Sequence, residues 1–505
     1  MKISENWLRT WVNPAIDSDK LSDQLTMLGL EVDDLSPAAK PFTGVVVGEV
    51  LTVEQHPDAD RLRVTTVNIG AAEPLQIVCG APNVRVGMKA PVATIGAVLP
   101  GDFKIKKGKL RGIESQGMLC GASEIDLEDK IDGLLELPED APVGINIREY
   151  LELDDNVIDI SITPNRGDCF SIRGIAREIG VINQLAVTTP DIKEVAATIS
   201  DEKQVVVTTE GCPRYLGRVI KNVNTKAATP AWMERALARS GIRQHSILVD
   251  ITNYVLMELG QPLHAFDAGQ VQGSVHVRQA TAGEKLVLLN EQEVELQDNV
   301  MVIADDEKAL AIAGIMGGLS SSVTDATTEI FLESAFFAPL AIAGRARSFG
   351  LHTDASQRYE RGVDFELPML AMHRASQLIA ELAGGEFGPI TVAENLNVLP
   401  TRDAIELNQA QVDQLLGYEV ATDFITDALT RLGCKVDVIA QGQWSVVPPS
   451  HRYDMAIYQD LIEEVARIHG YDNIQISLPV IDAQLAKYQD QFELAQLRQT
   501  AVTLG

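Results

Sequence analysis

The chain has 505 residues, 46% of them hydrophobic, and a formal net charge of −29. This length predicts about three or four domains, because a single core stops growing well below it. The negative charge disfavours non-specific binding to nucleic acid, since phosphate contacts need Lys and Arg side chains. Any such contact must come from local basic patches or from a partner chain that supplies positive charge.

The cysteines and the short apolar runs indicate where in the cell the protein is expected. The five cysteines lie far apart and form no Cys-x-x-Cys pair. This pattern excludes a disulfide framework and a thiolate zinc site, and it favours a reducing environment. The N-terminus has no long apolar core of a signal peptide. Apolar runs such as residues 309–319 are too short to span a bilayer. We therefore expect a soluble, cytoplasmic protein.

The predicted elements change in character along the chain. Residues 1–40 predict a helix, with Leu21, Leu25 and Leu28 on one stripe, and then a short strand. Residues 42–137 predict a small β-barrel, because short β-branched runs alternate with Gly and Pro. An α+β stretch follows from 205 to 395, and a helix-rich unit spans residues 400–475. The best strand candidates are 45–47, 62–67, 75–78, 90–95, 205–209 and 300–304, and the best later helices are 231–240 and 368–382.

One element occurs twice. Residues 19–35 parallel residues 422–439, each a helix ending in Leu-Gly before a strand. Downstream, residues 164–168 (PNRGD) parallel residues 450–454 (SHRYD), and a helix follows each. Chance likeness of two helix–strand units is the alternative, but the match at both ends favours a duplicated domain. The first copy is then discontinuous, at residues 1–40 plus 150–200, and the second lies at 399–477.

Motifs in the barrel and the central stretch resemble one family. Residues 56–62 (HPDADRL), 78–83 (VCGAPN) and 115–120 (SQGMLC) look like a tRNA-binding barrel of the OB-fold type. With residues 249–254 (VDITNY), 262–267 (PLHAFD), 313–318 (AGIMGG) and 358–364 (RYERGVD), the chain resembles the β subunit of bacterial phenylalanyl-tRNA synthetase. Family members continue well past residue 505. We therefore expect residues 478–505 to begin a catalytic-like domain that this chain truncates.

The resemblance implies a fold and a function. It implies an α+β multi-domain protein, with an OB-fold β-barrel (41–149) inserted in a discontinuous α/β domain. A central α+β editing domain of the B3/B4 type (201–398) and a helix-rich, winged-helix-like B5 domain (399–477) follow. It implies ATP-dependent phenylalanine–tRNA ligation with the α subunit of an α2β2 tetramer, on tRNA(Phe). The aminoacylation site is expected on the α subunit, with hydrolytic editing of Tyr-tRNA(Phe) here. A non-catalytic tRNA-binding scaffold is the alternative.

A basic run marks the barrel. It has five cations with only Asp102 close by, and strand alternation would place several on one face. Such a face can track an RNA backbone, or it can guard an exposed sheet edge. The resemblance favours nucleic acid. Because Phe103 is the only aromatic residue within the run, binding is expected to be weak and non-specific. The cations are Lys104, Lys106, Lys107, Lys109 and Arg111.

Four acidic residues near the end of the duplicated element form a second candidate site. Asp460, Glu463 and Glu464 share one helix face, and Asp454 lies just upstream. Carboxylates without His or Cys suit Mg²⁺, while the alternative is an ordinary acidic first turn of a helix. The resemblance implies a Mg²⁺ shared with the α subunit; an independent metallohydrolase is a weaker hypothesis. The first copy keeps only Asp168 and Glu178, so the fold does not demand all four acids.

The third candidate site lies in the central domain, which shows no nucleophile elbow, Walker loop or His-Glu-x-x-His motif. From the residues alone, its polar side chains could equally be satisfied buried groups. The resemblance implies that Glu333 and a glycine loop read the hydroxyl of a mischarged tyrosine. A second site is needed because an apolar pocket rejects an added hydroxyl by only about 10²-fold. The remaining candidates, expected to hold the ester, the 3′-terminal adenosine or the water, are His264, Asn253 and Thr252, and the loop glycines are Gly314, Gly317 and Gly318.

Overall fold

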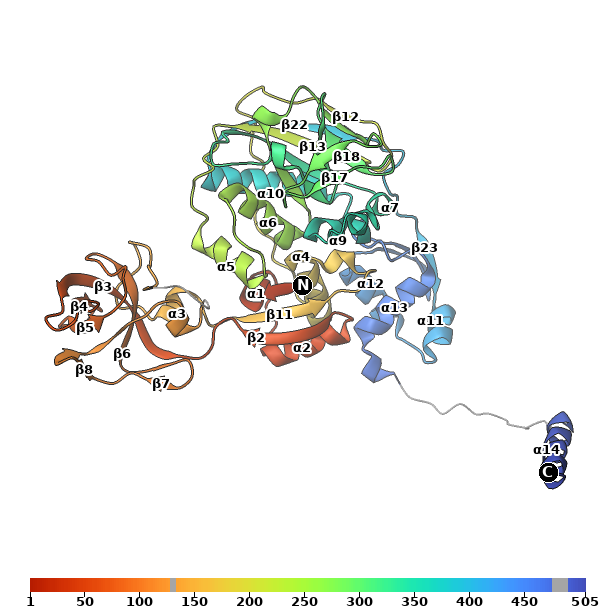
Figure 1. Ribbon diagram of the computed structural model, residues 1–505. Helices are drawn as coiled ribbons and strands as arrows, with labels where there is room; N and C mark the ends of the chain where they lie inside the picture. Colours follow the sequence, from red (N-terminus) through yellow and green to blue (C-terminus); the bar gives the residue numbers. More distant parts are fainter. Residues whose placement is uncertain (128–132, 475–488) are drawn as a thin grey trace.

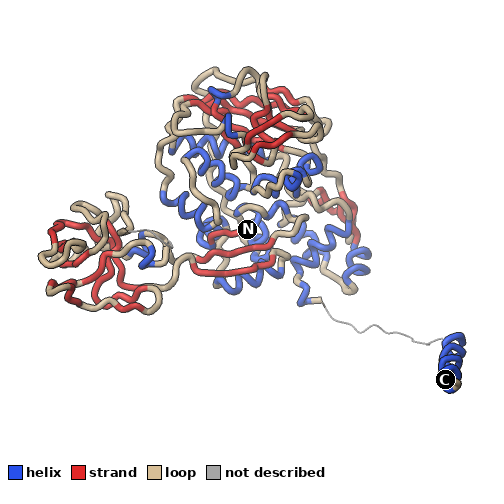
Figure 2. Tube along the Cα trace, viewed as in Figure 1, coloured by secondary structure: helices blue, strands red, loops and turns tan. Residues whose placement is uncertain are grey.

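The computed structural model describes residues 1–127, 133–474 and 489–505 (Figure 1). It is a mixed α+β protein of several units, in which helices and strands are interleaved (Figure 2). The barrel-like strands of residues 43–119 lie to one side of the other units in this view. Among the described helices, none is long and apolar enough to cross a membrane.

The first unit is a three-stranded antiparallel sheet built from two distant segments. Its strand order is β1 (Lys2–Ser4), β11 (Asn156–Ser161), β2 (Glu31–Pro37). The helices are α1 (Glu5–Trp11), α2 (Ser18–Met27) and α4 (Ile172–Asn183). Ser4 caps α1 by accepting from Trp7 N, and Asp17 caps α2 by accepting from Lys20 N. The stripe of Leu21, Leu25 and Leu28 is buried, as its helical spacing predicts.

The unit that interrupts this sheet is mostly β. Its main sheet has the order β10-β6-β3-β4-β5, and β7 pairs with β6. The four strands expected from β-branched runs are present as β3 to β6. A short hairpin, β8–β9, follows β7, and α3 leads back to the first unit. The bounds are β3 (Thr43–Gln55), β4 (Arg63–Asn68), β5 (Leu75–Cys79), β6 (Lys89–Leu99), β7 (Phe103–Lys104), β8 (Gly108–Leu110), β9 (Ile113–Ser115), β10 (Gly117–Leu119) and α3 (Ile147–Tyr150).

The central unit has two main sheets with helices against them. One sheet has the order β12-β15-β18-β19-β20 and the other β14-β21-β13-β22, and β16–β17 is a separate hairpin. The strands are β12 (Val205–Val207), β13 (Arg214–Lys221), β14 (Leu263–Asp267), β15 (Val275–Gln279), β16 (Lys285–Val287), β17 (Glu293–Glu295), β18 (Met301–Ala304), β19 (Ala309–Ile312), β20 (Met316–Gly317), β21 (Glu329–Phe336) and β22 (Glu386–Glu394). The helices are α5 (Ala231–Arg239), α6 (Ile247–Leu259), α7 (Pro339–Ile342), α8 (Arg345–Ser348), α9 (Asp354–Arg361) and α10 (Leu367–Leu382).

The last unit repeats the topology of the first. Its sheet has the order β23 (Ile405–Asn408), β25 (Gln443–Val447), β24 (Lys435–Ala440). Its helices are α11 (Gln409–Leu416), α12 (Thr422–Arg431) and α13 (Tyr458–His469), and α14 (Gln489–Thr503) follows later in the chain. In both units, strand, two helices and strand lead to a central strand and a final helix. The difference is that β25 follows β24 after a short turn, whereas residues 38–155 separate β2 from β11.

Candidate functional site

A cavity of about 170 Å³ lies in the central unit between its two sheets. His264 and Glu333 line it, and so do the loop glycines Gly314 and Gly317. His264 on β14 is the direct antiparallel partner of Glu333 on β21, so the two side chains share one face of the sheet. The strand register thus brings together two polar residues that are far apart in the sequence.

Glu333 is a buried carboxyl with one protein partner. The hydroxyl of Tyr215, on the neighbouring strand β13, donates to its Oε2 over 2.7 Å. Burial raises the pKa of Glu333 to about 7, although the Tyr215 hydrogen bond acts in the opposite direction. Near neutral pH the carboxyl therefore exchanges between an acceptor and a form that also donates.

His264 is held neutral by its surroundings. Burial lowers the pKa of its imidazole to about 4, so the ring is uncharged at neutral pH. The ring packs edge-to-face on Phe266, with 4.4 Å between centroids. Its Nε2 is enclosed and has no hydrogen-bond partner among the described residues. A buried ring nitrogen without a partner at a cavity is the mark of a site that expects a ligand or a water.

The glycines allow the main chain to approach this ring. A Cβ added at Gly317 would lie 2.5 Å from His264 Cε1, so no side chain fits there. Gly314 has φ +68° and packs against Phe337 and Tyr359, where a side chain would be both strained and crowded. Gly318 does not line the cavity; a Cβ there would instead meet the carbonyl oxygen of Leu310 at 2.5 Å.

Two predicted members of this site lie elsewhere. Thr252 and Asn253 are on α6 and are not among the residues that line the cavity. The Thr252 hydroxyl donates to Val249 O, one turn earlier in its own helix, and the side chain is buried. The structure therefore does not bring them together with His264 and Glu333 at the cavity, and their role in holding the ester, the 3′-terminal adenosine or the water stays a prediction.

The four acids of the last unit do not gather around one point. Arg452 forms a double hydrogen bond with Asp454, and its third nitrogen donates to Glu464 over 2.8 Å. Asp460 accepts from the backbone nitrogens at the start of α13, as a helix cap does. Glu463 is exposed, whereas Glu464 is buried. Buried arginines thus already neutralise two of the acids, and the four-carboxylate Mg²⁺ site stays a prediction.

The first copy explains two of these acids. Arg166 contacts Asp168 and Glu178 in the way that Arg452 contacts Asp454 and Glu464. Arg467 then joins the copies, donating both to Glu464 and to Glu178. Asp454 and Glu464 are thus equivalents of Asp168 and Glu178, and only Asp460 and Glu463 are particular to the second copy. We call these seven side chains the charge network: Arg166, Asp168, Glu178, Arg452, Asp454, Glu464 and Arg467.

The basic run lies on β7 and β8 of the inserted unit and on the residues that flank them. All five of its cations are exposed, while Ile105 between them points into the core. The run is split between β7 and β8, so it does not form one face of a single strand as the alternation predicted. Lys107 pairs with Glu114 over 2.7 Å, and Arg111 donates to the carbonyl oxygen of Asp58. Lys104, Lys106 and Lys109 keep their charges directed to solvent.

Three family models match the chain. They describe a putative tRNA binding domain at residues 45–146, a B3/4 domain at 211–384 and a tRNA synthetase B5 domain at 405–471. The chain is 81% identical over all 505 residues to the phenylalanine–tRNA ligase beta subunit of Acinetobacter baylyi. It is 60% identical over 501 residues, 98% of the chain, to that of Psychrobacter arcticus. Over its whole length the chain is similar to phenylalanine–tRNA ligase beta subunits.

The chain spans 64% and 62% of the lengths of these two members of the phenylalanine–tRNA ligase beta-subunit family. Among solved structures, an N-terminal fragment of the phenylalanyl-tRNA synthetase beta subunit from Pyrococcus horikoshii matches 93% of this chain at 12% identity. The match covers 99% of that fragment, with a TM-score of 0.37. The basic run lies within the tRNA-binding match, the cavity of His264 and Glu333 within the B3/4 match, and the four acids within the B5 match.

Sequence reasoning missed Tyr359, which lines the cavity, and Tyr215, which binds the cavity residue Glu333. Tyr215 binds Glu333, and the Tyr359 hydroxyl donates to the carbonyl oxygen of Ala335. A signal existed for Tyr215, because it lies in a largely buried strand and a buried tyrosine hydroxyl needs a partner. That partner was invisible without the strand register.

Proposed function

We propose that this chain acts as the β subunit of a phenylalanine–tRNA ligase and hydrolyses tyrosine wrongly esterified to tRNA(Phe). The observation that carries the proposal is the pairing of Glu333 and His264 across one cavity beside a side-chain-free stretch of main chain. A cavity of about 170 Å³ suits one amino-acid side chain, with the tRNA outside it. The B3/4 match supports the assignment.

Glu333 is proposed to recognise the tyrosine hydroxyl. Tyr215 occupies one carboxyl oxygen, which leaves the other for the substrate. With phenylalanine in the cavity, that oxygen would lose its partner at a cost of about 1–3 kcal/mol. The same site therefore discriminates against the cognate amino acid, which is what an editing site needs.

His264 is proposed to hold the attacking water. Its neutral ring can accept the water proton at Nε2, which lacks another partner among the described residues. The water oxygen then bonds to the ester carbonyl carbon, the bond to the ribose oxygen breaks, and the His264 ring returns its proton to that oxygen, so that tyrosine and tRNA separate. An ester is reactive enough that a positioned water suffices without a covalent enzyme intermediate.

The other units are proposed to serve the larger enzyme. The inserted unit, proposed as an OB-fold barrel at 41–149, would contact tRNA through Lys104, Lys106 and Lys109. The discontinuous unit (1–40 and 150–200) and a winged-helix-like B5 unit (399–477) would support the α subunit, with residues 201–398 between them as the editing domain and 478–505 opening a further domain. ATP-dependent aminoacylation, with its Mg²⁺, would take place on the α subunit of a cytoplasmic α2β2 tetramer.

The test of editing is hydrolysis of tyrosyl-tRNA(Phe). We expect the wild-type chain to release tyrosine and Glu333→Ala to do so at least about tenfold more slowly, since it loses a hydrogen bond to a buried carboxyl. Phenylalanyl-tRNA(Phe) is the control substrate, on which the two proteins should differ little. Equal, slow hydrolysis by both proteins would reject editing and favour a scaffold role.

A second variant tests the glycine loop. In Gly317→Ala the new Cβ must displace the His264 ring, so hydrolysis is expected to fall about tenfold or more, with about 1–3 kcal/mol of destabilisation. Rates and melting temperatures should be measured together. The matched control is Gly80→Ala, whose Cβ would meet only Leu62 Cδ2 at an ordinary 3.4 Å. Full activity in Gly317→Ala would show that the His264 ring position does not matter.

A further inference from the structure

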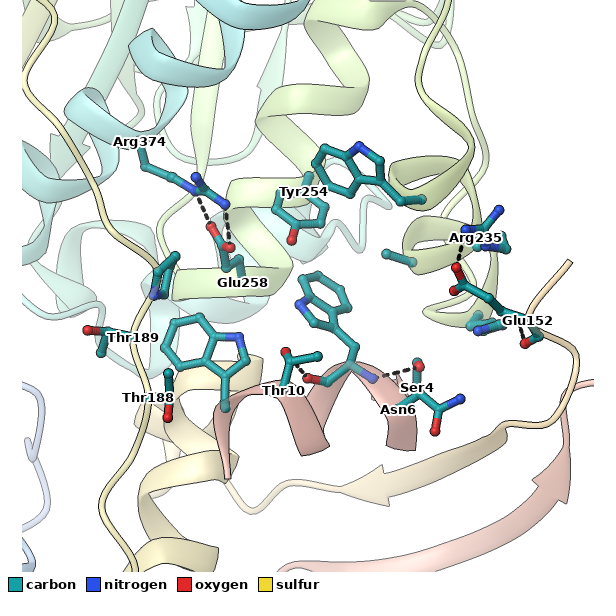
Figure 3. A pocket seen from close by; sticks show the side chains of 16 residues that line it. Ser4, Asn6, Thr10, Glu152, Thr188, Thr189, Arg235, Tyr254, Glu258 and Arg374 are labelled. Atoms are coloured by element: carbon teal, nitrogen blue, oxygen red, sulfur yellow. Dashed lines mark hydrogen bonds and ion pairs between the residues drawn. The ribbon is translucent and has the colours of Figure 1, made fainter. Parts of the chain in front are cut away.

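A second, larger cavity lies outside the proposed editing site. It has a volume of about 430 Å³, within the roughly 300–1,000 Å³ range of small-molecule sites. Its walls come from α1 of the first unit and from α5, α6 and α10 of the central unit (Figure 3). Boundaries between units are common places for ligand sites.

Aromatic rings dominate this cavity. Trp7, Trp11 and Trp232 line it, which are three of the four tryptophans in the chain. Tyr254 stacks on Trp7 with 4.8 Å between centroids and meets Trp232 edge-to-face at 5.1 Å. Trp232 remains 42% exposed, although its neighbours Trp7 and Tyr254 are buried. An exposed indole beside a cavity offers a flat apolar surface that a planar ligand would cover.

The charged groups at the cavity are already paired. Arg374 grips both oxygens of Glu258, over 2.7 and 2.8 Å, and Figure 3 shows this pair at the back of the cavity. Arg235 binds Glu152 over 2.7 Å. Neither carboxylate is therefore free to bind the ammonium group of an amino acid or of a choline-like ligand, although such cations favour aromatic sites.

The free polar groups are mainly donors. Among the described residues, Trp444 is the one tryptophan whose indole N–H has an acceptor. The indole N–H groups of the three tryptophans at the cavity are therefore free to donate to a ligand. The side chains of Thr188 and Thr189 add hydroxyls at its edge (Figure 3). The ligand that fits is planar, uncharged in its ring, and rich in hydrogen-bond acceptors.

We propose that this cavity binds a nucleobase, supplied either by a free nucleotide or by an unpaired residue of RNA. A base has a π-face that stacks on indole, and its ring nitrogens and carbonyl oxygens accept hydrogen bonds. Stacking of this kind is tolerant of sequence, so several bases should bind with similar affinity. The site is separate from the cavity of Glu333, so it stands whether or not the chain edits.

The test follows tryptophan emission while the chain is titrated with each of the four ribonucleoside monophosphates. We expect saturable quenching, because three of the four tryptophans line the cavity. In Trp232→Ala the dissociation constant should rise about tenfold or more, as loss of base stacking predicts. Trp232→Phe keeps an aromatic face and should stay within about threefold of wild type. Trp444→Phe, away from the cavity, should keep the wild-type affinity.

A second arm identifies the source of the base. It repeats the titration with a single-stranded tetranucleotide in a Phe103→Ala background, which removes the aromatic side chain of the basic run. Quenching that depends on Trp232 with the tetranucleotide but not with mononucleotides supports an RNA residue; quenching with both supports a free nucleotide. The proposal is overturned if neither quenches at millimolar concentration, if Trp232→Ala binds as well as wild type, or if only phenylalanine, tyrosine or choline quenches.

Discussion

Replacing Arg452 with methionine is expected to lower the free energy of unfolding by about 3–5 kcal/mol. Arg452 is buried and holds Asp454 on one side and Glu464 on the other. Without the guanidinium, Asp454 loses its partner and Glu464 keeps only Arg467. Removing one member of a buried ion pair is far costlier than the pair's net contribution, because a desolvated charge remains.

Two further variants provide comparisons for the stability loss in Arg452→Met. Arg166→Met removes the equivalent arginine of the first copy and should cost a similar amount. Arg85→Met removes an exposed partner of Glu136, and a solvent-screened surface pair contributes little to stability. Urea unfolding followed by tryptophan fluorescence compares the three. If Arg452→Met unfolds no more easily than Arg85→Met, the charge network does not stabilise the fold.

The loss of stability in Arg452→Met is also expected to depend on pH. Burial alone would raise the pKa values of Asp168 and Glu464, but the arginines beside them outweigh it and hold both pKa values well below their usual range. Carboxyls with depressed native pKa values contribute stability that is complete above the unfolded pKa of about 4 and lost as pH falls through the native value. The difference in unfolding free energy between wild type and Arg452→Met should therefore become smaller in strong acid.

The charge network also shows where sequence reasoning stops. The stripe of Leu21, Leu25 and Leu28 predicted a buried helix face because helix periodicity is local. The partner of Glu178 is Arg467, 289 residues away, and no spacing rule reveals such a pair. Counting acids on one face of α13 suggested a cation site, but the sequence did not show that Arg452 pairs with Asp454 and Glu464.

The candidate editing cavity was predictable only in part, because some of its contacts join residues far apart in the sequence. Motif likeness selected Glu333, His264 and the glycine loop, and the register of β14 against β21 puts the first two opposite each other. Thr252 and Asn253, selected by the same motif likeness, do not line the cavity. Tyr215 was left out, because its contact with Glu333 spans 118 residues and two strands.

Glu333→Gln is expected to raise the free energy of unfolding in mild alkali. It should also remove the carboxylate that is proposed to recognise the tyrosine hydroxyl. The native pKa of Glu333 is raised to about 7 from an ordinary value of 4.5. A raised pKa contributes stability that is full below the unfolded value and lost as pH rises through the native one. Between about pH 4.5 and 7 this group thus costs wild type on the order of 3 kcal/mol, at about 1.4 kcal/mol per pH unit.

Glutamine has nearly the same shape, still accepts from Tyr215, and never ionises. The variant should therefore match wild type near pH 5 and exceed its unfolding free energy by up to about 3 kcal/mol near pH 8. Glu293→Gln, at an exposed pair with Lys285, is the control and should leave stability nearly unchanged at either pH. A gap that does not grow with pH would mean that Glu333 ionises as an ordinary carboxyl. A gap that grows, together with lost hydrolysis, would mean that the chain keeps an unfavourable buried acid because its chemistry needs one.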